Sequence, residues 1–270
     1  MYSTDVTAAG TYSPLAQFGN VARSEYRKLR SVRSTYWTLF FALAFNLGLG
    51  ALLSVFVAGR LSPGDRATVD SVRLSLGGLH LSQVAIGVLG VLAITSEYGT
   101  GMIRATFSAV PQRAMVLAAK AFIFTAVALV VGVVSSFGAF FLFQALLPNS
   151  DLKVGLSDPG VLRAVFGGGL YMAVLGLFGL GLGAIIRATA GAVAALLVAL
   201  FVPPLLLELL PYNWQTNISP YIPMQAGGQI FVATKHDAHS LSAWNGFGVF
   251  CLYAVISLAV GFFLLNRRDA

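Results

Sequence analysis

The sequence predicts an all-α membrane protein with six transmembrane helices, and two observations support this fold class. Hydrophobic residues make up 57% of the 270 residues and charged residues only 10%, whereas about a quarter of the residues in a soluble domain are charged. The charges are also bunched, so that several apolar windows reach the roughly 20 residues that a helix needs to cross a bilayer. A chain with several such windows crosses the membrane several times.

Six apolar windows give the predicted spans. The third is longer than one crossing requires, so we expect it to tilt or to begin outside the bilayer. The chain then divides into an N-terminus (1–36), a membrane domain (37–265) and a tail (266–270). Residues 1–36 are polar and then basic, which argues against a removable signal peptide. The spans are Trp37–Gly59, Leu74–Ile94, Met115–Leu147, Val161–Ile186, Ala190–Leu210 and Trp244–Leu265.

The distribution of charge predicts the orientation. With the N-terminus inside, the cytoplasmic segments hold 11 basic and 4 acidic residues, and the outer segments hold 6 basic and 6 acidic residues. The whole net charge of +7 then lies on one side, as the positive-inside rule requires. We therefore expect a multi-pass protein of the bacterial inner membrane with both termini in the cytoplasm. The same rule explains the basic composition, so no nucleic-acid partner is expected.

Two segments beside the spans are expected to be helical without crossing. Residues 18–36 place apolar side chains at three- to four-residue steps with arginines on other faces, which predicts an amphipathic helix in the headgroup layer. A solvated basic tail is the alternative. Residues 211–243 are rich in Pro, Gly, Asn and aromatic residues. They predict short helices and turns, or a re-entrant segment, at the outer surface before the last span.

A short cytoplasmic element lies between the second and third spans, at residues 95–120. We expect Glu97 to begin it, because a carboxylate is favoured at a helix N-terminus. Gly99 and Gly101 permit a sharp turn and Pro111 limits the helix. Lys120 can reach the headgroups from the third span. A compact helix of mixed charge outside the membrane is suited to docking a soluble partner.

The residues of this element carry a resemblance. The string E-Y-G-T-G-M-I-R-A-T from Glu97, with A-V-P-Q-R and A-A-K after it, resembles the cytoplasmic loop of type-2 ABC exporter permeases, especially actinobacterial ones. Three other segments are similar to that family: residues 24–37 (its connecting helix), the turn from Arg187, and residues 219–228 (its outer segment). The resemblance implies that the loop at 97–113 holds the coupling helix that docks on the ATPase. The implied coupling residues are Glu97, Tyr98, Gly99, Thr100, Arg104, Pro111 and Arg113.

The resemblance also implies partners, because the chain has no GxxxxGK[ST] loop with which to bind ATP. It implies two copies of an ABC ATPase subunit, which would bind the ATP and Mg, and a second permease that is either a copy or a paralogue. No cofactor is expected in this chain, and it is not expected to be an enzyme by itself.

Several polar residues inside the spans are further candidates. Asn46, His80 and Gln83 are costly in a membrane unless they find partners, so they either line a translocation pathway or hydrogen-bond between helices. Glu208 lies beside a helix break and is either a proton-relay residue or, as we favour, an interfacial carboxylate. His236 and His239 have helical metal-pair spacing but no clear third ligand, so no metal site is predicted.

Other classes of function were compared with ATP-driven export. An ion-coupled secondary transporter or channel is the main alternative, and it predicts paired ionisable residues in the span centres and internal repeats, which are not found. An intramembrane enzyme would need a catalytic constellation that the spans lack. A non-transporting scaffold stays open. The uncharged span centres favour a hydrophobic or amphiphilic substrate such as a drug, lipid or peptide.

Overall fold

The computed structural model describes residues 13–57, 60, 62, 64, 69–148, 152–234 and 239–267. These residues form helices and turns and contain no β-strand. Six helices among them are long and apolar enough to cross a membrane: Arg33–Val57, Leu79–Gly99, Arg113–Leu146, Val161–Ile186, Thr189–Leu207 and Ala243–Arg267. The prediction of an all-α membrane protein with six spans is confirmed.

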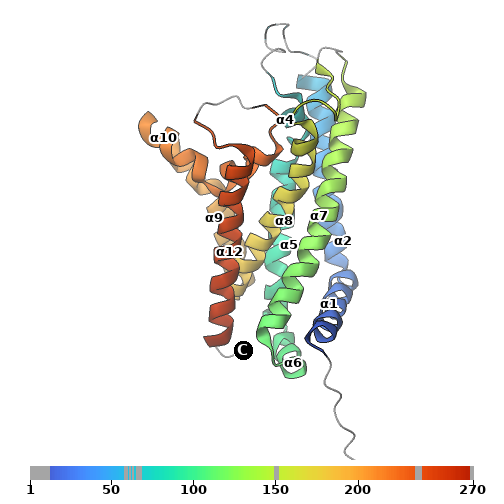
Figure 1. The fold of residues 1–270 in the computed structure, drawn as a ribbon, viewed down its shortest axis with the longest axis vertical. Coiled ribbons are helices and arrows are strands. Elements are labelled where there is room, and N and C mark those ends of the chain that lie inside the picture. Colours follow the sequence, from blue (N-terminus) through green and yellow to red (C-terminus); the bar gives the residue numbers. More distant parts are fainter. Residues whose placement is uncertain are drawn as a thin grey trace, which may run out of the picture.

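The elements form an elongated bundle with two distinct ends (Figure 1). One end carries α1, α6 and the C-terminal end of α12, and is called the α6 end below. The other carries α4 and α10, and is called the α4 end. The elements are α1 (Pro14–Ser31), α2 (Arg33–Leu52), η1 (Leu53–Val57), α4 (Ser71–Ser75), α5 (Leu79–Gly99), α6 (Met102–Ala109), α7 (Arg113–Leu146), α8 (Val161–Ile186), α9 (Thr189–Leu207), α10 (Tyr212–Ile218), η4 (Ser219–Tyr221), α11 (Pro223–Gly228), η5 (Gln229–Phe231) and α12 (Ala243–Arg267).

Helix α8 is the centre of the bundle because its glycines let other helices approach closely. It packs against α5, α7 and α12, and 67% of its apolar window is buried, against 22% for α2 and α9. A Cβ at Gly90 of α5 would lie 2.2 Å from the carbonyl oxygen of Gly176 on α8, and one at Gly179 would lie 2.4 Å from that of Gly87. The glycine-rich span therefore packs inside one chain, as small residues do in membrane helices.

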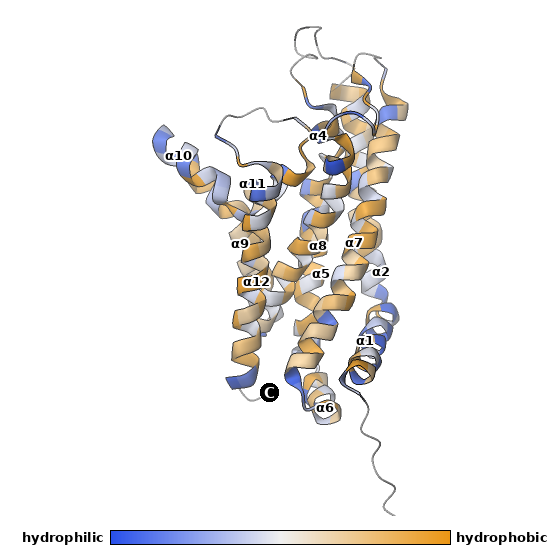
Figure 2. Cartoon of the chain, in the orientation of Figure 1, coloured by the Kyte–Doolittle hydropathy of each residue, from blue (hydrophilic) through white to orange (hydrophobic). Residues whose placement is uncertain are grey.

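The spans are mostly hydrophobic along their middle, as the colouring of Figure 2 shows. Helix α2 exposes a ridge of aromatic rings, Trp37, Phe40, Phe41 and Phe45. Polar colour is concentrated at the two ends and on α1 (Figure 2). An apolar belt with polar ends matches the profile of a bilayer.

Two predicted boundaries shift. The helix expected over 18–36 is α1, which ends at Ser31, because Val32 is extended (φ −88°, ψ 112°) and α2 begins at Arg33. The second span begins at Leu79 rather than Leu74 and runs on to Gly99. Its start is displaced because α4 and a tight turn precede it, with Gly78 packed on the backbone of α2. An average over apolar residues cannot detect such a turn.

Candidate functional site

Helix α6 is a short helix between two spans, and glycine makes the turn into it possible. Helix α5 ends at Gly99, where the Thr100 hydroxyl donates a hydrogen bond to the Ser96 carbonyl at 2.9 Å. Gly101 then adopts a left-handed conformation with φ +71°, which residues with a side chain rarely do. Helix α6 ends at Ala109, before an extended residue and Pro111. The predicted short helix of this loop is therefore present at residues 102–109.

One face of α6 is packed and the other is open. Ile103 is buried and Phe107 is half-buried against the bundle. The opposite face is exposed, and its residues are called the open face of α6: Met102, Arg104, Ala105, Ser108 and Ala109. Beside it, Gly99, Thr100 and Pro111 are exposed as well. The loop thus presents a small surface of mixed polarity at the α6 end.

A buried cluster of four charged side chains lies behind α6. Lys120 of α7 donates to Glu97 Oε1 of α5 at 2.8 Å and also pairs with Glu25 of α1. Lys28 of α1 donates to Glu25 Oε1 at 2.8 Å and to Glu97 Oε1 at 2.9 Å. Glu25, Glu97 and Lys120 are at most 5% exposed. We call these four residues the ion cluster.

The ion cluster joins α1 to α5 and α7. The negative charges of its two carboxylates equal the positive charges of its two ammonium groups. Buried ions need such opposite charges nearby to offset the cost of desolvation. The ammonium group of Lys28 also lies 3.4 Å from the Thr106 hydroxyl, which extends the contacts to α6. Burial disfavours the charged form of Lys28, but hydrogen bonds and attraction from Glu25 and Glu97 outweigh it and raise the pKa of Lys28. Lys28 therefore stays charged at physiological pH.

Two sequence-based expectations about these charges are wrong. Glu97 does not begin an exposed loop: it lies in the last turn of α5 and is 2% exposed. Lys120 does not reach towards the membrane surface, because it is buried between Glu25 and Glu97. The sequence reading also missed Glu25 and Lys28 as site residues. The available signal was a lone acid in a basic amphipathic helix, on the same face as the buried Val21 and Ala22.

Two arginines tie the α6 end to the last helix. Arg113 donates to the Leu265 carbonyl at 2.7 Å and lies over the Phe107 ring, 5.3 Å from its centroid. Arg187 donates to the Leu264 carbonyl at 3.3 Å and lies 5.0 Å over the Tyr98 ring. Cations at a helix C-terminus satisfy its free carbonyls and complement its dipole. Arg113 and Tyr98, both predicted coupling residues, therefore contact the ends of other helices.

The predicted pathway residues separate into two groups. Asn46 is fully buried and donates to the Ser135 hydroxyl at 2.9 Å, across α2 and α7. Gln83 is 1% exposed, accepts a hydrogen bond from Tyr171 and donates to the His80 carbonyl at 3.1 Å. These contacts correspond to the interhelical alternative. His80 is exposed and lines a cavity.

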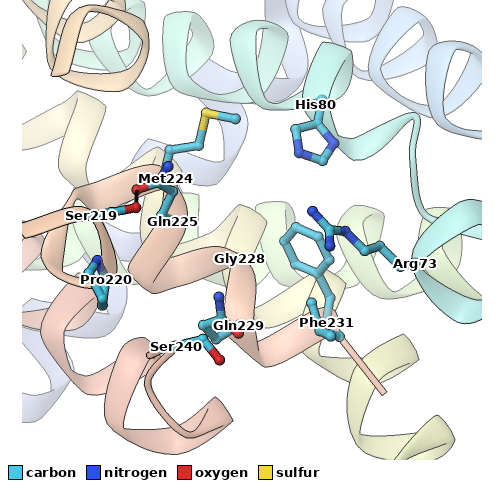
Figure 3. A pocket seen from close by; sticks show the side chains of 11 residues that line it. Arg73, His80, Ser219, Pro220, Met224, Gln225, Gly228, Gln229, Phe231 and Ser240 are labelled. Atoms are coloured by element: carbon cyan, nitrogen blue, oxygen red, sulfur yellow. Dashed lines mark hydrogen bonds between the residues drawn. The ribbon is translucent and has the colours of Figure 1, made fainter. Parts of the chain in front are cut away.

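The cavity beside His80 lies at the α4 end and has a volume of about 360 Å³. Figure 3 shows Arg73 and His80 on one side of it and the α11–η5 segment, with Gln229 and Phe231, on the other. Ser219 donates to Gln225 Oε1 at 2.7 Å within the wall. Arg73 comes from α4 and His80 from the first turn of α5. This space is called the α4 cavity below.

Asp70 and Arg163 hold one wall of the α4 cavity in place. Asp70 accepts two backbone hydrogen bonds at the start of α4 and three more from Ala233 and Thr234, at 2.9 to 3.3 Å. Arg163 of α8 donates to the carbonyls of Ile230, Val232 and Ala233 at 3.0 to 3.2 Å. The segment after η5 is therefore anchored to both α4 and α8.

Comparison with known families decides what kind of protein carries these features. The family model described as ABC-2 family transporter protein matches residues 76–270. The chain belongs to this family. It is a permease component of an ABC transporter, and its family implies an ABC ATPase as partner. No curated protein matches the chain.

The match to the ABC-2 family includes α5 to α12 and therefore the whole of α6. Within the ion cluster, Glu97 and Lys120 lie inside the matched region of this ABC-2 permease, whereas Glu25 and Lys28 precede it. His80 and Gln83 are inside it, and Asn46 and Arg73 precede it.

Of the remaining candidate site residues of the ABC-2 permease, those that the structure describes lie away from the ion cluster and from α6. Glu208 is exposed beyond the last residue of α9, and its carbonyl accepts a hydrogen bond from Gln215 at 3.4 Å. His236 lies outside the described residues. Within the described part of the chain, no group of three potential metal-ligating residues occurs.

Proposed function

We propose that this ABC-2 permease is the membrane subunit of an ATP-driven exporter, and that a separate ATPase docks on the open face of α6. The exporter moves a hydrophobic or amphiphilic substrate, such as a drug, lipid or peptide, outward. The observation that supports this most directly is the placement of α6: a short helix with one exposed face, attached on its other side to several spans. ATP and Mg are bound by the partner.

The contacts behind α6 are suited to transmit motion. A tight glycine turn connects α6 to α5, and the ion cluster connects α5 with α1 and α7. Arg113 links the start of α7 to the end of α12. Because packed interiors deform little, a displacement of α6 would be passed to the ends of these helices together. The residues that bind the ATPase and those that pass on its motion are thus different.

The membrane arrangement of the proposal follows from the charges and the family. The α6 end faces the cytoplasm of a bacterial cell, with both termini on that side, and the α4 end faces out. Two ATPase subunits serve two permeases, which are identical or paralogous. The fully buried charges among the described residues lie at the α6 end rather than in the span centres. This distribution favours an apolar or amphiphilic substrate and gives no support to an ion-coupled carrier.

Association with the ATPase is the first test. The permease, affinity-tagged and purified from its native membranes, should bring with it a polypeptide that carries a P-loop and hydrolyses ATP. Ser108→Arg places a large cation on the open face and should abolish this association. Arg104→Ala removes a charged anchor, and such anchors contribute about 2 kcal/mol or more when they are central to an interface.

The matched control is Ala190→Arg, since Ala190 is also a small exposed residue, in the first turn of α9. We expect this variant to keep its ATPase and its export. If Ser108→Arg keeps the partner and transports at the wild-type rate, the open face of α6 is not the docking surface.

Labelling from outside tests the orientation. In a variant in which the single Cys251 is replaced by Ser, a cysteine at Lys153, an exposed residue between α7 and α8, should react with a membrane-impermeant maleimide in intact cells. A cysteine at Ser108 should react only after the cells are opened. The reverse pattern would invert the proposed topology.

A further inference from the structure

The α4 cavity contains a cation, Arg73, that has no counter-ion among the residues that the structure describes. Arg73 is exposed, and its guanidinium makes no hydrogen bond or ion pair with the rest of the described chain. The residues that line the cavity include no aspartate or glutamate among those described. Asp70, the nearby acid on the same element, has both carboxylate oxygens engaged by backbone and hydroxyl donors. The described lining of the cavity therefore carries one permanent cation, Arg73, and no acid.

Two further polar side chains, His80 and Gln229, line the same space. Figure 3 shows the guanidinium of Arg73 and the ring of His80 pointing towards one another. The Nδ1 of His80 lies 3.2 Å from the Gly77 carbonyl and donates to it, so the Nε2 of the neutral ring is an acceptor and His80 contributes to the wall rather than to the anion contacts. The amide of Gln229 lines the cavity as well. A guanidinium with neighbouring N–H donors is the arrangement that binds carboxylate or phosphate oxygens in a forked geometry.

The rest of the lining combines polar residues (Ser219, Gln225 and Ser240) with an apolar part. Phe231 packs edge-on against the His80 ring, with centroids 6.2 Å apart, and Met224 and Val232 complete the wall. The volume of about 360 Å³ is in the range of small-molecule sites. The cavity also lies beside the first turn of α5, at one end of this candidate span.

We propose that the α4 cavity binds the anionic headgroup, phosphate or carboxylate, of an amphiphilic molecule. Arg73 is the principal anion-binding residue, and the amide of Gln229 is the accompanying donor. The apolar part of the molecule lies against Phe231 and the adjoining membrane-facing surface. Either a membrane lipid or an exported anionic amphiphile has this chemistry, and free phosphate has its charged part alone.

This inference does not depend on the ATPase or on α6, so it can fail while the proposed function stands. The test is isothermal titration calorimetry on the complete permease, purified in a maltoside detergent. The probes are dihexanoyl phosphatidylglycerol, its zwitterionic analogue dihexanoyl phosphatidylcholine, and inorganic phosphate. We expect phosphatidylglycerol to bind at least tenfold more tightly than phosphatidylcholine, and phosphate to compete with it weakly.

Two variants identify the residue that binds. Arg73→Gln should lower the affinity for phosphatidylglycerol at least tenfold, and Arg73→Lys should retain part of it, because lysine keeps the charge but not the fork. Lys153→Gln removes the same charge from an exposed position on the loop between α7 and α8 and should leave affinity within twofold. Each variant should have the same elution volume in size-exclusion chromatography and the same melting temperature as the wild type.

Three results would overturn the inference. Equal affinity for the two lipids would show that the cavity does not distinguish an anionic from a zwitterionic headgroup. An unchanged affinity of Arg73→Gln for phosphatidylglycerol would show that Arg73 does not bind the anion. Phosphate binding as tightly as phosphatidylglycerol would overturn the amphiphile assignment in favour of a free anion.

Discussion

The two ends of the bundle use their cations in opposite ways. At the α6 end, Lys120 is buried between two carboxylates that come from α1 and α5. At the α4 end, Arg73 is exposed, faces a cavity, and has no partner in the described chain. Lys120 lies in the candidate span α7, and Arg73 lies in α4, just before the candidate span α5. Both side chains are cations, and they differ in burial and in pairing with acidic residues.

The difference shows how burial and pairing distinguish structural charges from charges available to a ligand. Desolvating an ion costs several kcal/mol unless a partner compensates, so the buried cations must have their partners inside the chain. An exposed guanidinium remains hydrated at little cost and can exchange water for a ligand. This contrast between paired and unpaired cations can be tested by replacing one cation at a time. The expected loss of stability decreases in the order given below.

Lys120→Ala should have the largest effect. It leaves Glu25 and Glu97 buried with one ammonium group between them, and breaking a buried pair in this way costs about 3–5 kcal/mol. Thermal or SDS-induced unfolding in detergent measures the loss, with Lys153→Ala as the control for an exposed lysine. The double variant Lys120→Met/Glu97→Gln restores neutrality and should lose less than the two single changes combined. Equal stability of Lys120→Ala and the wild type would show that the cluster does not hold this end together.

Arg163→Gln should have an intermediate effect, because the α4 end also contains a structural cation. Its guanidinium is half-buried and donates to one carbonyl within η5 and two carbonyls after it. Losing hydrogen bonds from a charged group costs on the order of 2 kcal/mol. The same unfolding assay measures it, and proteolysis of the segment at 232–234 should become faster. If neither changes, the anchoring of this wall is not due to Arg163.

Arg73→Gln should have the smallest effect on stability. Surface substitutions without partners usually change the free energy of unfolding by no more than about 0.5 kcal/mol, and Arg73 is exposed without a partner in the described chain. Unfolding in a lipid-free detergent measures this intrinsic value. A loss comparable to that of Arg163→Gln would place Arg73 among the structural cations and remove the contrast between the ends.

The sequence was sufficient for the spans and for α6, because both depend on local signals. Apolar windows of span length define the helices, and Gly101 with Pro111 sets the limits of the short helix between them. The turn before α5 was missed because Leu76 and the glycines after it are as apolar on average as a helix. The ion cluster was missed for a different reason: Lys120 and Glu25 are 95 residues apart, and no local pattern pairs them. Consequently Glu97 was expected in the exposed loop, whereas the structure places it in the last turn of α5, buried behind α6.

The central claim is that the open face of α6 contacts the ATPase, and site-specific photo-cross-linking tests it most directly. Benzoylphenylalanine is placed at Ser108, on the open face, or at Ala190, which is exposed in the first turn of α9. The permease is then irradiated in native membranes, and adducts are identified by mass spectrometry. The account predicts an adduct between position 108 and a P-loop ATPase that is strongly reduced at position 190. An intact complex that gives no adduct at position 108 would contradict it.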